Sequence, residues 1–368
     1  MDSSDVRIRR QRLRGNVGKS FSLEMNVWTR LEKFTADSRR PLILAIGNFD
    51  GVHRGHQRIL DAVVARAKGI GGVPAVLTFF EHPQRVLHGS QEPRLLTSPQ
   101  HRLLLFQQSK IEVCFFLHFT LELSKTSPEE FVRKWLVRQL GVREVHLGYN
   151  AHFGFNRRGN GALMKQLAGE LGFNFFEAEP LMVEREFVSS TLIRASILKG
   201  DLERAGQLLG RPFSVFASVV RGKGRGKGLG YPTANLKVHS EILPPRGVYP
   251  VELRERGFHL DSIVETTEFE YRADEPGDWR PGVLNFGVRP TFGETTGEPV
   301  PEVFLFNFTG NLYGKTVEVV FHPKLRDEKT FPQASELVRA IEEDVTQAER
   351  YFSALRRPLQ REGKSVIL

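Results

Sequence analysis

The chain has 368 residues and a formal net charge of +9, with 40% hydrophobic and 26% charged residues. This composition is ordinary for a globular protein, and the length predicts two domains. We expect neither a membrane protein nor a secreted one, because no apolar run approaches roughly 18 residues and the N-terminus lacks the apolar core of a signal peptide. The single cysteine, Cys114, lies in an apolar run. With one cysteine, no intrachain disulfide can form, which is typical of a cytoplasmic protein. We interpret Cys114 as a core residue.

Residues 1–40 show no sustained hydrophobic period and carry much of the positive charge. They are predicted to form a basic, disordered arm that precedes the folded domains. A second basic stretch runs from Arg221 to Lys227. Such charge can bind nucleic acid, but we favour anionic small molecules as partners, with no membrane contact.

Residues 41–209 are predicted to form the first domain, in which short apolar runs alternate with helical patterns. Apolar residues recur at helical spacing from Ile59 to Ala67, and a capped helix opens at Ser127-Pro128. Four apolar runs are typical of buried strands: residues 42–46, 73–80, 114–117 and 145–147. Strands that alternate with helices predict a parallel sheet of the α/β class.

Residues 210–356 are predicted to form the second domain, which is rich in β-strand patterns. The expected strands are residues 214–220, 248–253, 283–286, 303–308 and 316–321. Glycine- and proline-rich turns separate them, which predicts an antiparallel barrel or sandwich. An amphipathic helix is expected over residues 332–352, and the polar segment 254–280 is interpreted as a long surface loop.

The first chemical motif, Gly47 to His56, follows the first predicted strand directly and opens the first predicted helix. A helix N-terminus attracts phosphate through its free N–H groups and its dipole. His53 and His56 are three residues apart, so they should share one face of the helix and donate hydrogen bonds to a phosphate. This pattern favours nucleotidyl transfer, because such a reaction needs positioning and electrostatics and no protein nucleophile. Two ordinary histidines or a metal pair are the alternatives, although no third ligand lies at an obvious spacing.

A second motif, Ser189 to Arg194, also lies at a predicted helix start. Hydroxyl groups and an arginine in that position can bind phosphate, although a plain helix cap with a solvated arginine fits equally well when the motif is taken alone. Together with the histidine motif, it favours phosphate binding.

A third motif runs from Arg221 to Asn235 and alternates glycines with cations before Pro232-Thr233-Ala234-Asn235. Such a backbone can fold over a polyphosphate, and the oxygens of Thr233 and Asn235 are suited to Mg²⁺. The alternative is a basic loop or a nucleic-acid patch. Only Tyr231 is close enough to stack on a base, which makes nucleic acid an unfavoured partner.

These motifs, with Phe80-Glu81-His82-Pro83, closely resemble the bacterial bifunctional riboflavin kinase/FMN adenylyltransferase (FAD synthetase) family. The resemblance implies a Rossmann-like nucleotidyltransferase domain, a six-stranded antiparallel flavokinase barrel with a terminal helix, Mg²⁺ with ATP, and flavins as substrate and product. It implies His53 and His56 as catalytic residues. The ATP site of the first domain is expected at Gly47, Asn48, Phe49, Asp50, Gly51, Gly55, Ser189, Ser190, Thr191 and Arg194.

In the second domain the resemblance extends to Gly282–Thr291, Leu312-Tyr313-Gly314 and Leu325–Lys329. It implies that Glu302, on the strand before Leu312, takes the proton from the hydroxyl group of riboflavin. Without the resemblance, a solvated strand residue would be the preferred interpretation of Glu302. ATP is expected at Gly222, Gly224, Arg225, Lys227, Gly230, Pro232, Thr233 and Asn235, with Mg²⁺ at the last two. Flavin is expected at His82, Pro83, Asn150, Arg289 and Arg326.

One segment departs from the family pattern. Gly148 to Gly154 carries Asn150 and Ala151 where an acid and an aromatic residue are usual. The leading hypothesis is therefore a bifunctional enzyme, and the alternative is a riboflavin kinase with a weakened or inactive adenylyltransferase half. A flavin-binding or RNA-binding regulator is a third hypothesis, against which the histidine pair and Glu302 argue.

Overall fold

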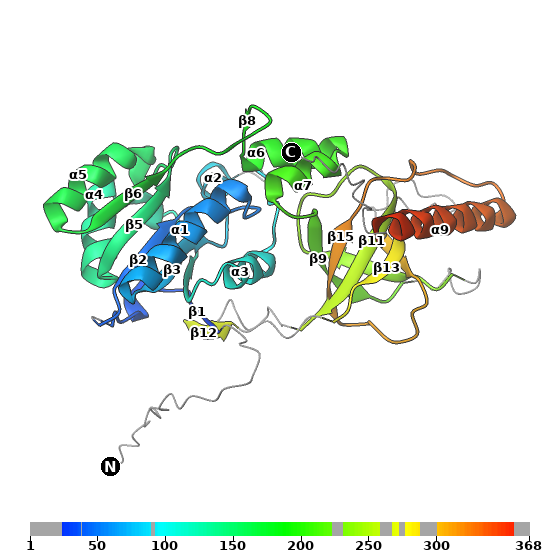
Figure 1. The fold of residues 1–368 in the computed structure, drawn as a ribbon, viewed down its shortest axis with the longest axis horizontal. Coiled ribbons are helices and arrows are strands. Elements are labelled where there is room, and N and C mark those ends of the chain that lie inside the picture. Colours follow the sequence, from blue (N-terminus) through cyan, green and yellow to red (C-terminus); the bar gives the residue numbers. More distant parts are fainter. Residues whose placement is uncertain are drawn as a thin grey trace, which may run out of the picture.

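The computed structural model describes residues 24–37, 39–89, 93–222, 231–257, 267–271, 277–287 and 300–356. These residues form a sheet-based domain and a barrel, joined through two helices, α6 (Ser190–Lys199) and α7 (Leu202–Leu209) (Figure 1). The predicted boundary between residues 209 and 210 therefore falls where α7 ends.

The N-terminal domain is built on a seven-stranded sheet whose order is β12-β1-β4-β3-β2-β5-β6. All of its strand pairs are parallel except β12 with β1, as predicted for the α/β class. The strands are β1 (Met25–Trp28), β2 (Leu42–Ile46), β3 (Val73–Phe79), β4 (Val113–Leu117), β5 (Val142–Gly148), β6 (Asn174–Ala178) and β12 (Glu268–Tyr271).

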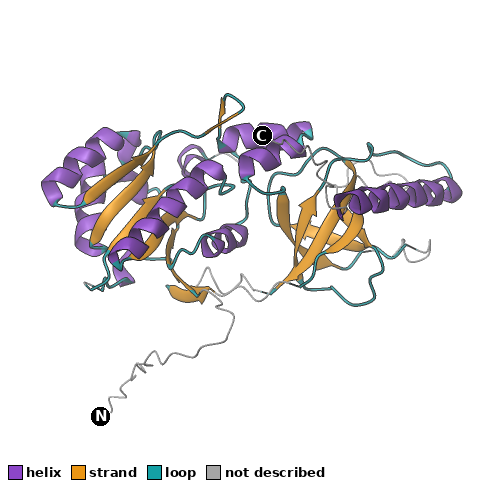
Figure 2. Cartoon of the chain, in the orientation of Figure 1, coloured by secondary structure: helices purple, strands orange, loops and turns teal. Residues whose placement is uncertain are grey.

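Helices cover both faces of this sheet, which explains why its central strands β2, β3 and β4 are apolar at nearly every position (Figure 2). On one face lie α1 (Arg54–Ile70) and α3 (Pro99–Gln108). On the other lie α5 (Gly161–Leu171) and the short α4 (Pro128–Glu130), which continues as a π-helix over Phe131–Gln139. Cys114 on β4 is fully buried and burial raises the pKa of its thiol, so its assignment to the core is confirmed.

The prediction of a disordered arm over residues 1–40 is wrong at its C-terminal end. Residues 25–28 form β1, which pairs with β4 on one side and with β12 on the other. Met25 and Val27 are fully buried, and a 3-10 helix follows at Leu31–Lys33. A four-residue strand is too short to show a period in the sequence, so only its pairing across the sheet reveals it.

The interpretation of residues 254–280 as one surface loop is also wrong. Residues 254–256 belong to β11, and residues 268–271 form β12, whose Tyr271 is buried. The barrel domain therefore contributes a strand to the sheet of the other domain, and β1 and β12 lie side by side below α3 in Figure 1. The pairing is non-local, and no signal within the segment itself could predict it.

Met25→Ala is expected to lower the free energy of unfolding of the N-terminal domain by about 2–5 kcal/mol, because it leaves a cavity between the sheet and its helices. The matched control is Asn26→Ala, which changes the exposed neighbour on the same strand and should have little effect. Chemical denaturation of both variants measures the difference. Equal stability of the two would show that β1 does not contribute to the core.

The C-terminal domain is a closed six-stranded antiparallel barrel with the order β10-β14-β13-β11-β15-β9, which confirms the predicted architecture. Its strands are β9 (Ser214–Val220), β10 (Ala234–Val238), β11 (Gly247–Arg256), β13 (Arg280–Gly287), β14 (Val300–Leu305) and β15 (Thr316–Phe321). The predicted terminal helix is α9 (Ala334–Arg356). Its Ala348 and Phe352 pack against Val248 and Val283 on the outside of the barrel.

The two domains touch through α3 and β9. The imidazole ring of His101 stacks on the ring of Phe216, with 4.6 Å between centroids. Glu241, in a loop of the barrel, accepts hydrogen bonds from Arg85 on α2 (Pro83–His88) and from the backbone N–H of Leu95. These contacts set the barrel beside the end of the sheet where the first motif lies.

Candidate active sites

The turn between β2 and α1 has an unusual backbone. Phe49 and Val52 have φ angles of 49° and 39°, and Gly51 lies between them with φ of 82°. A Cβ atom on Gly51 would lie 2.8 Å from a side-chain carbon of Leu96, so glycine is required there. Left-handed conformations at non-glycine residues cost about 1–3 kcal/mol each and persist only where the surroundings enforce them.

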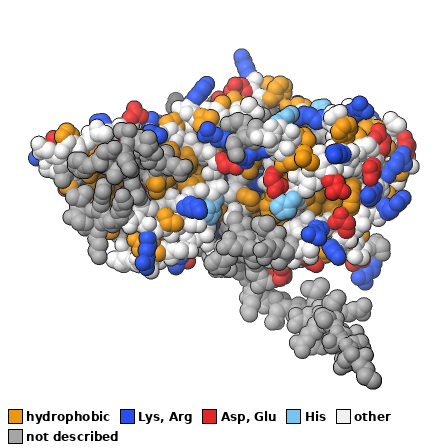
Figure 3. All heavy atoms as spheres, turned by 180° about the vertical axis from the view of Figure 1, so that it is seen from behind, with side chains coloured by type: hydrophobic (Ala, Val, Ile, Leu, Met, Phe, Trp, Pro, Cys, Tyr) orange, Lys and Arg blue, Asp and Glu red, His pale blue; other side chains and the backbone are white. Residues whose placement is uncertain are grey.

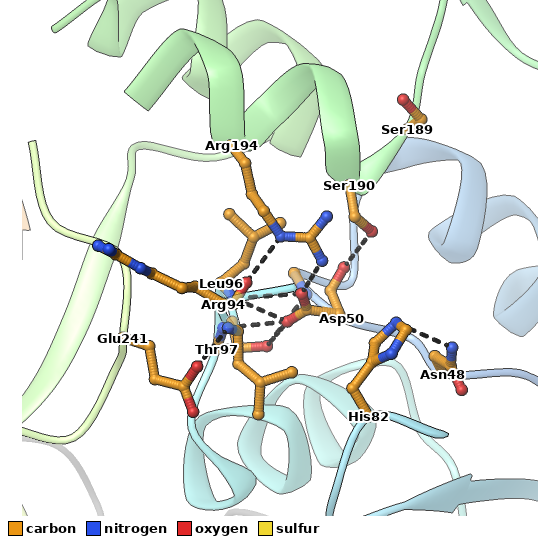
Figure 4. Close-up of polar contacts among 12 residues, drawn as sticks. Asn48, Asp50, His82, Arg94, Leu96, Thr97, Ser189, Ser190, Arg194 and Glu241 are labelled. Atoms are coloured by element: carbon orange, nitrogen blue, oxygen red, sulfur yellow. Dashed lines mark hydrogen bonds and ion pairs between the residues drawn. The ribbon is translucent and has the colours of Figure 1, made fainter. Parts of the chain in front are cut away.

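The carboxylate of Asp50 joins two motifs that are far apart in the sequence (Figure 4). It is 2% exposed and accepts hydrogen bonds from the backbone N–H groups of Leu96 and Thr97, at 2.9 and 3.2 Å. The guanidinium group of Arg194 reaches it from α6 at 2.7 Å, and the Ser190 hydroxyl donates to the Asp50 carbonyl oxygen at 2.9 Å. Asp50 and Arg194 are thus brought together, and their ion pair helps to hold the turn against α6.

His53 and His56 stack on each other at the start of α1, with 3.6 Å between ring centroids and 16° between planes. His53 caps the helix, because its Nδ1 accepts a hydrogen bond from the His56 backbone N–H at 3.3 Å. The proton of neutral His53 therefore resides on Nε2, which is free to donate to a bound oxygen.

Both imidazoles are neutral near pH 7. Burial, with the charges of Arg211 and Arg194 adding to it, lowers the pKa of His53 to about 4. Burial and the neighbouring His53 and Arg211 hold the pKa of His56 well below its usual value. Neutral imidazole donors in a low-dielectric site stabilise developing negative charge strongly.

The remaining residues predicted for the first site gather around this turn. Asn48 Nδ2 lies 3.3 Å from Nε2 of His82, and Pro83 begins the helix α2 that follows His82. Gly55 packs closely on the imidazole of His53, because a Cβ atom on Gly55 would lie 3.2 Å from that ring. Gly47 directly follows β2, Ser189 caps α6, and Thr191 is exposed in the first turn of that helix.

Asn150 is exposed just beyond the end of β5, and Ala151 packs against the core beside it. Strand β5 pairs with β2 in parallel, so Asn150 lies at the same edge of the sheet as the turn between β2 and α1. That edge, at the carboxyl ends of parallel strands, is where α/β sheets bind their ligands.

A second polar group lies on the outer face of the barrel. Glu302 on β14 stands directly opposite Asn235 on β10 and Asn285 on β13, so the three side chains form one row. The Thr233 hydroxyl lies 3.5 Å from a carboxylate oxygen of Glu302. Gly222 is necessary beside this row, because a Cβ atom there would lie 1.9 Å from the Asn235 amide.

Hydroxyl, amide and carboxylate oxygens are the kinds of ligand that Mg²⁺ binds in proteins, so the residues in this row fit the predicted ion. A cluster of three or more His, Cys, Asp or Glu side chains is absent from the residues that the structure describes.

The structure also places the other residues predicted for the second site. Pro232 is exposed just before Thr233. Arg326 forms a bidentate ion pair with Asp344 of α9, at 2.8 and 2.7 Å, and so fastens that helix to the barrel. Gly224, Arg225, Lys227, Gly230 and Arg289 lie outside the described residues.

Two residues of these sites were missed by sequence reasoning. Arg102 on α3 is 2% exposed and donates to the carbonyl oxygens of Asn48, Phe79 and Phe80, at 3.2, 2.7 and 2.9 Å. It ties the ends of β2 and β3 together, yet a single arginine in a helix gives no signal in the sequence. Asn285 stands opposite Glu302 on the neighbouring strand, and its place within the Gly282–Thr291 motif was the signal in the sequence that could have identified it.

Charged side chains of both signs are spread over one face of the molecule (Figure 3). In the face shown in Figure 3, Lys and Arg side chains are interspersed with Asp and Glu over the described surface, and they do not gather into one basic patch. In the described part of the chain, no helix has the length and apolar character needed to cross a membrane.

Known proteins resemble both halves of this chain. Residues 35–192 match the family model described as FAD synthetase, and residues 209–352 match the one described as riboflavin kinase. A bifunctional riboflavin kinase/FMN adenylyltransferase from Bacillus subtilis is 33% identical over 86% of this chain and 94% of its own. The one from Pseudomonas fluorescens is 35% identical over 84% of this chain and 92% of its own.

A solved structure described as a macrolide-efflux protein from Streptococcus pneumoniae also matches, with a TM-score of 0.69 and 25% identity. The match covers 87% of this chain and 98% of that one. The two-domain arrangement therefore has a counterpart among solved structures.

Proposed function

Because this chain belongs to the bifunctional riboflavin kinase/FMN adenylyltransferase family, we propose that it phosphorylates riboflavin to FMN and then adenylylates FMN to FAD, using ATP in both steps. The observation that carries this proposal is that one chain holds both constellations: the stacked His53 and His56 at a helix start, and the row of Glu302 and Asn235 on the barrel. ATP, riboflavin and FMN are its partners.

In adenylyl transfer, a phosphate oxygen of FMN forms a bond to the α-phosphorus of ATP, and the bond to pyrophosphate breaks. We assign His53 and His56 to the phosphate oxygens that gain charge in the transition state, since the free Nε2–H of His53 is a neutral, buried donor. Ser189, Ser190 and Thr191, at the start of α6, offer further donors to the triphosphate.

In riboflavin phosphorylation, the 5′-hydroxyl oxygen of the ribityl chain forms a bond to the γ-phosphorus of ATP, and the bond to ADP breaks. We assign Glu302 to receive the proton of that hydroxyl group. Thr233 and Asn235 would hold Mg²⁺, which neutralises phosphate charge when bound. The oxygens of Thr233 and Glu302 are close enough to act on one substrate.

The proposal is tested by incubating the full chain with riboflavin and Mg-ATP and resolving the flavins by chromatography over time. Riboflavin should fall, FMN should rise and then decline, and FAD should accumulate. A parallel incubation with FMN in place of riboflavin should give FAD directly. Accumulation of FMN alone would favour a kinase with an inactive adenylyltransferase half, and binding without turnover would favour a regulator.

A further inference from the structure

The turn that carries His53 is held from the other domain. Arg211 follows α7 and precedes β9, at the entry to the barrel. Its guanidinium group donates to the carbonyl oxygen of Gly51 at 2.7 Å and to that of Val52 at 3.1 Å. Gly51 and Val52 are two of the left-handed residues of the turn, and His53 follows them directly.

A second donor supports the same carbonyl from within α1. The side-chain amide of Gln57 donates to the carbonyl oxygens of Val52 and Leu209, at 2.8 and 2.9 Å. Leu209 is also a partner of Arg211, at 3.4 Å. Arg211 and Gln57 therefore connect the strained turn to the end of α7. The chain is also closely packed at the adjacent Gly210, where a Cβ atom would lie only 2.9 Å from a side-chain carbon of Arg54.

The position of Arg211 is costly, which argues that its contacts are specific. Burial lowers the pKa of its guanidinium group to about 10. Its hydrogen-bond partners among the described residues are neutral carbonyl oxygens, whereas buried arginines usually pair with a carboxylate. A hydrogen bond from a charged donor is stronger than one from a neutral donor and suits the task of holding a strained backbone.

From these contacts we infer that Arg211 is a positioning residue for adenylyl transfer. It holds the turn that orients His53 and His56, so the geometry of the first site depends on the segment that leads into the barrel. The inference rests on the proposed function for the reaction that it serves. A displacement of about 1 Å in a positioning element can cost about 10²-fold in rate.

The test compares Arg211→Met, which keeps the length of the side chain without its donors, with Arg211→Lys, which keeps the charge and can donate to a carbonyl. Arg211→Met should lower kcat for FAD synthesis from FMN by about 10–100-fold, with a smaller change in KM for ATP. Arg211→Lys should recover part of this loss, and riboflavin phosphorylation should stay within about twofold in both variants.

The matched control is Arg204→Met, which removes another guanidinium group of the same α7 region. Arg204 contacts Glu184, Glu186 and the Val183 carbonyl and does not reach the turn, so both activities should be retained. Unchanged kcat for FAD synthesis in Arg211→Met would overturn the inference, as would an equal loss of both activities together with a lower melting temperature.

A measurement without turnover separates this inference from the proposed function. Imidazole resonances of His53 and His56 can be followed by NMR as a function of pH. The groups that face His53 are Arg211, Arg194 and the stacked His56. Loss of the Arg211 charge in Arg211→Met should therefore raise the pKa of His53 from about 4. Arg211→Lys keeps the charge and should leave the pKa of His53 low. Resonances that are the same in Arg211→Met and wild type would contradict the inference, whereas a wild-type protein that makes no FAD would contradict only the proposed function.

Discussion

Glu302→Gln is expected to slow riboflavin phosphorylation by about 10²–10⁴-fold, because the amide keeps the shape of the carboxylate but cannot accept the proton of the hydroxyl group. Conversion of added FMN to FAD should continue, since Glu302 lies on the barrel and the histidine turn lies on the other domain. Initial rates of FMN formation, with ATP and riboflavin saturating, measure the effect.

The matched control for this variant is Glu255→Gln. Glu255 is also a strand residue of the barrel, but it lies on β11 and forms an ion pair with Lys315, just before β15, away from the row of Glu302. This control should keep nearly full kinase activity. A Glu302→Gln enzyme that forms FMN at a near-normal rate would contradict the role that we assign to the carboxylate.

His53→Ala and His56→Ala are expected to lower FAD synthesis by about 10²–10³-fold each, the effect of removing a donor to charge that develops in the transition state. FMN formation from riboflavin should continue in both variants. His88→Ala is the matched control, because His88 is an exposed histidine at the end of α2 in the same domain. Loss of both activities in a folded His53→Ala protein would show that the two sites are not independent.

The pH profile of wild-type FAD synthesis should report the same histidines. A neutral imidazole becomes charged as the pH falls through its pKa, so any loss of rate through protonation of His53 should begin only as the pH approaches about 4. An acid limb centred near 6.5, the usual pKa of histidine, would show that His53 is more solvated than the structure has it.

Local patterns in the sequence determined much of the fold. The apolar runs that became β2 and β4 are buried at every position, and such strands are recognisable because every residue in them is apolar. The runs within β3 and β5 are recognisable for the same reason, although these strands also include polar residues. The histidine turn and the Thr233-to-Asn235 segment were also predictable, since each is contiguous and has side chains that few structural roles require. The six-stranded barrel followed from the family resemblance and agrees with the strand pattern.

Only the tertiary structure decided how distant segments meet. The pairing of β12 with β1, the ion pair of Asp50 with Arg194, and the hydrogen bonds of Arg211 to Gly51 and Val52 join residues that lie far apart in the chain. The physical reason is that the groups that meet in these contacts are mostly backbone N–H and C=O groups, which nearly every residue carries. The sequence therefore does not show which of them will pair. The pairing depends on which segments the packed cores bring within hydrogen-bonding distance.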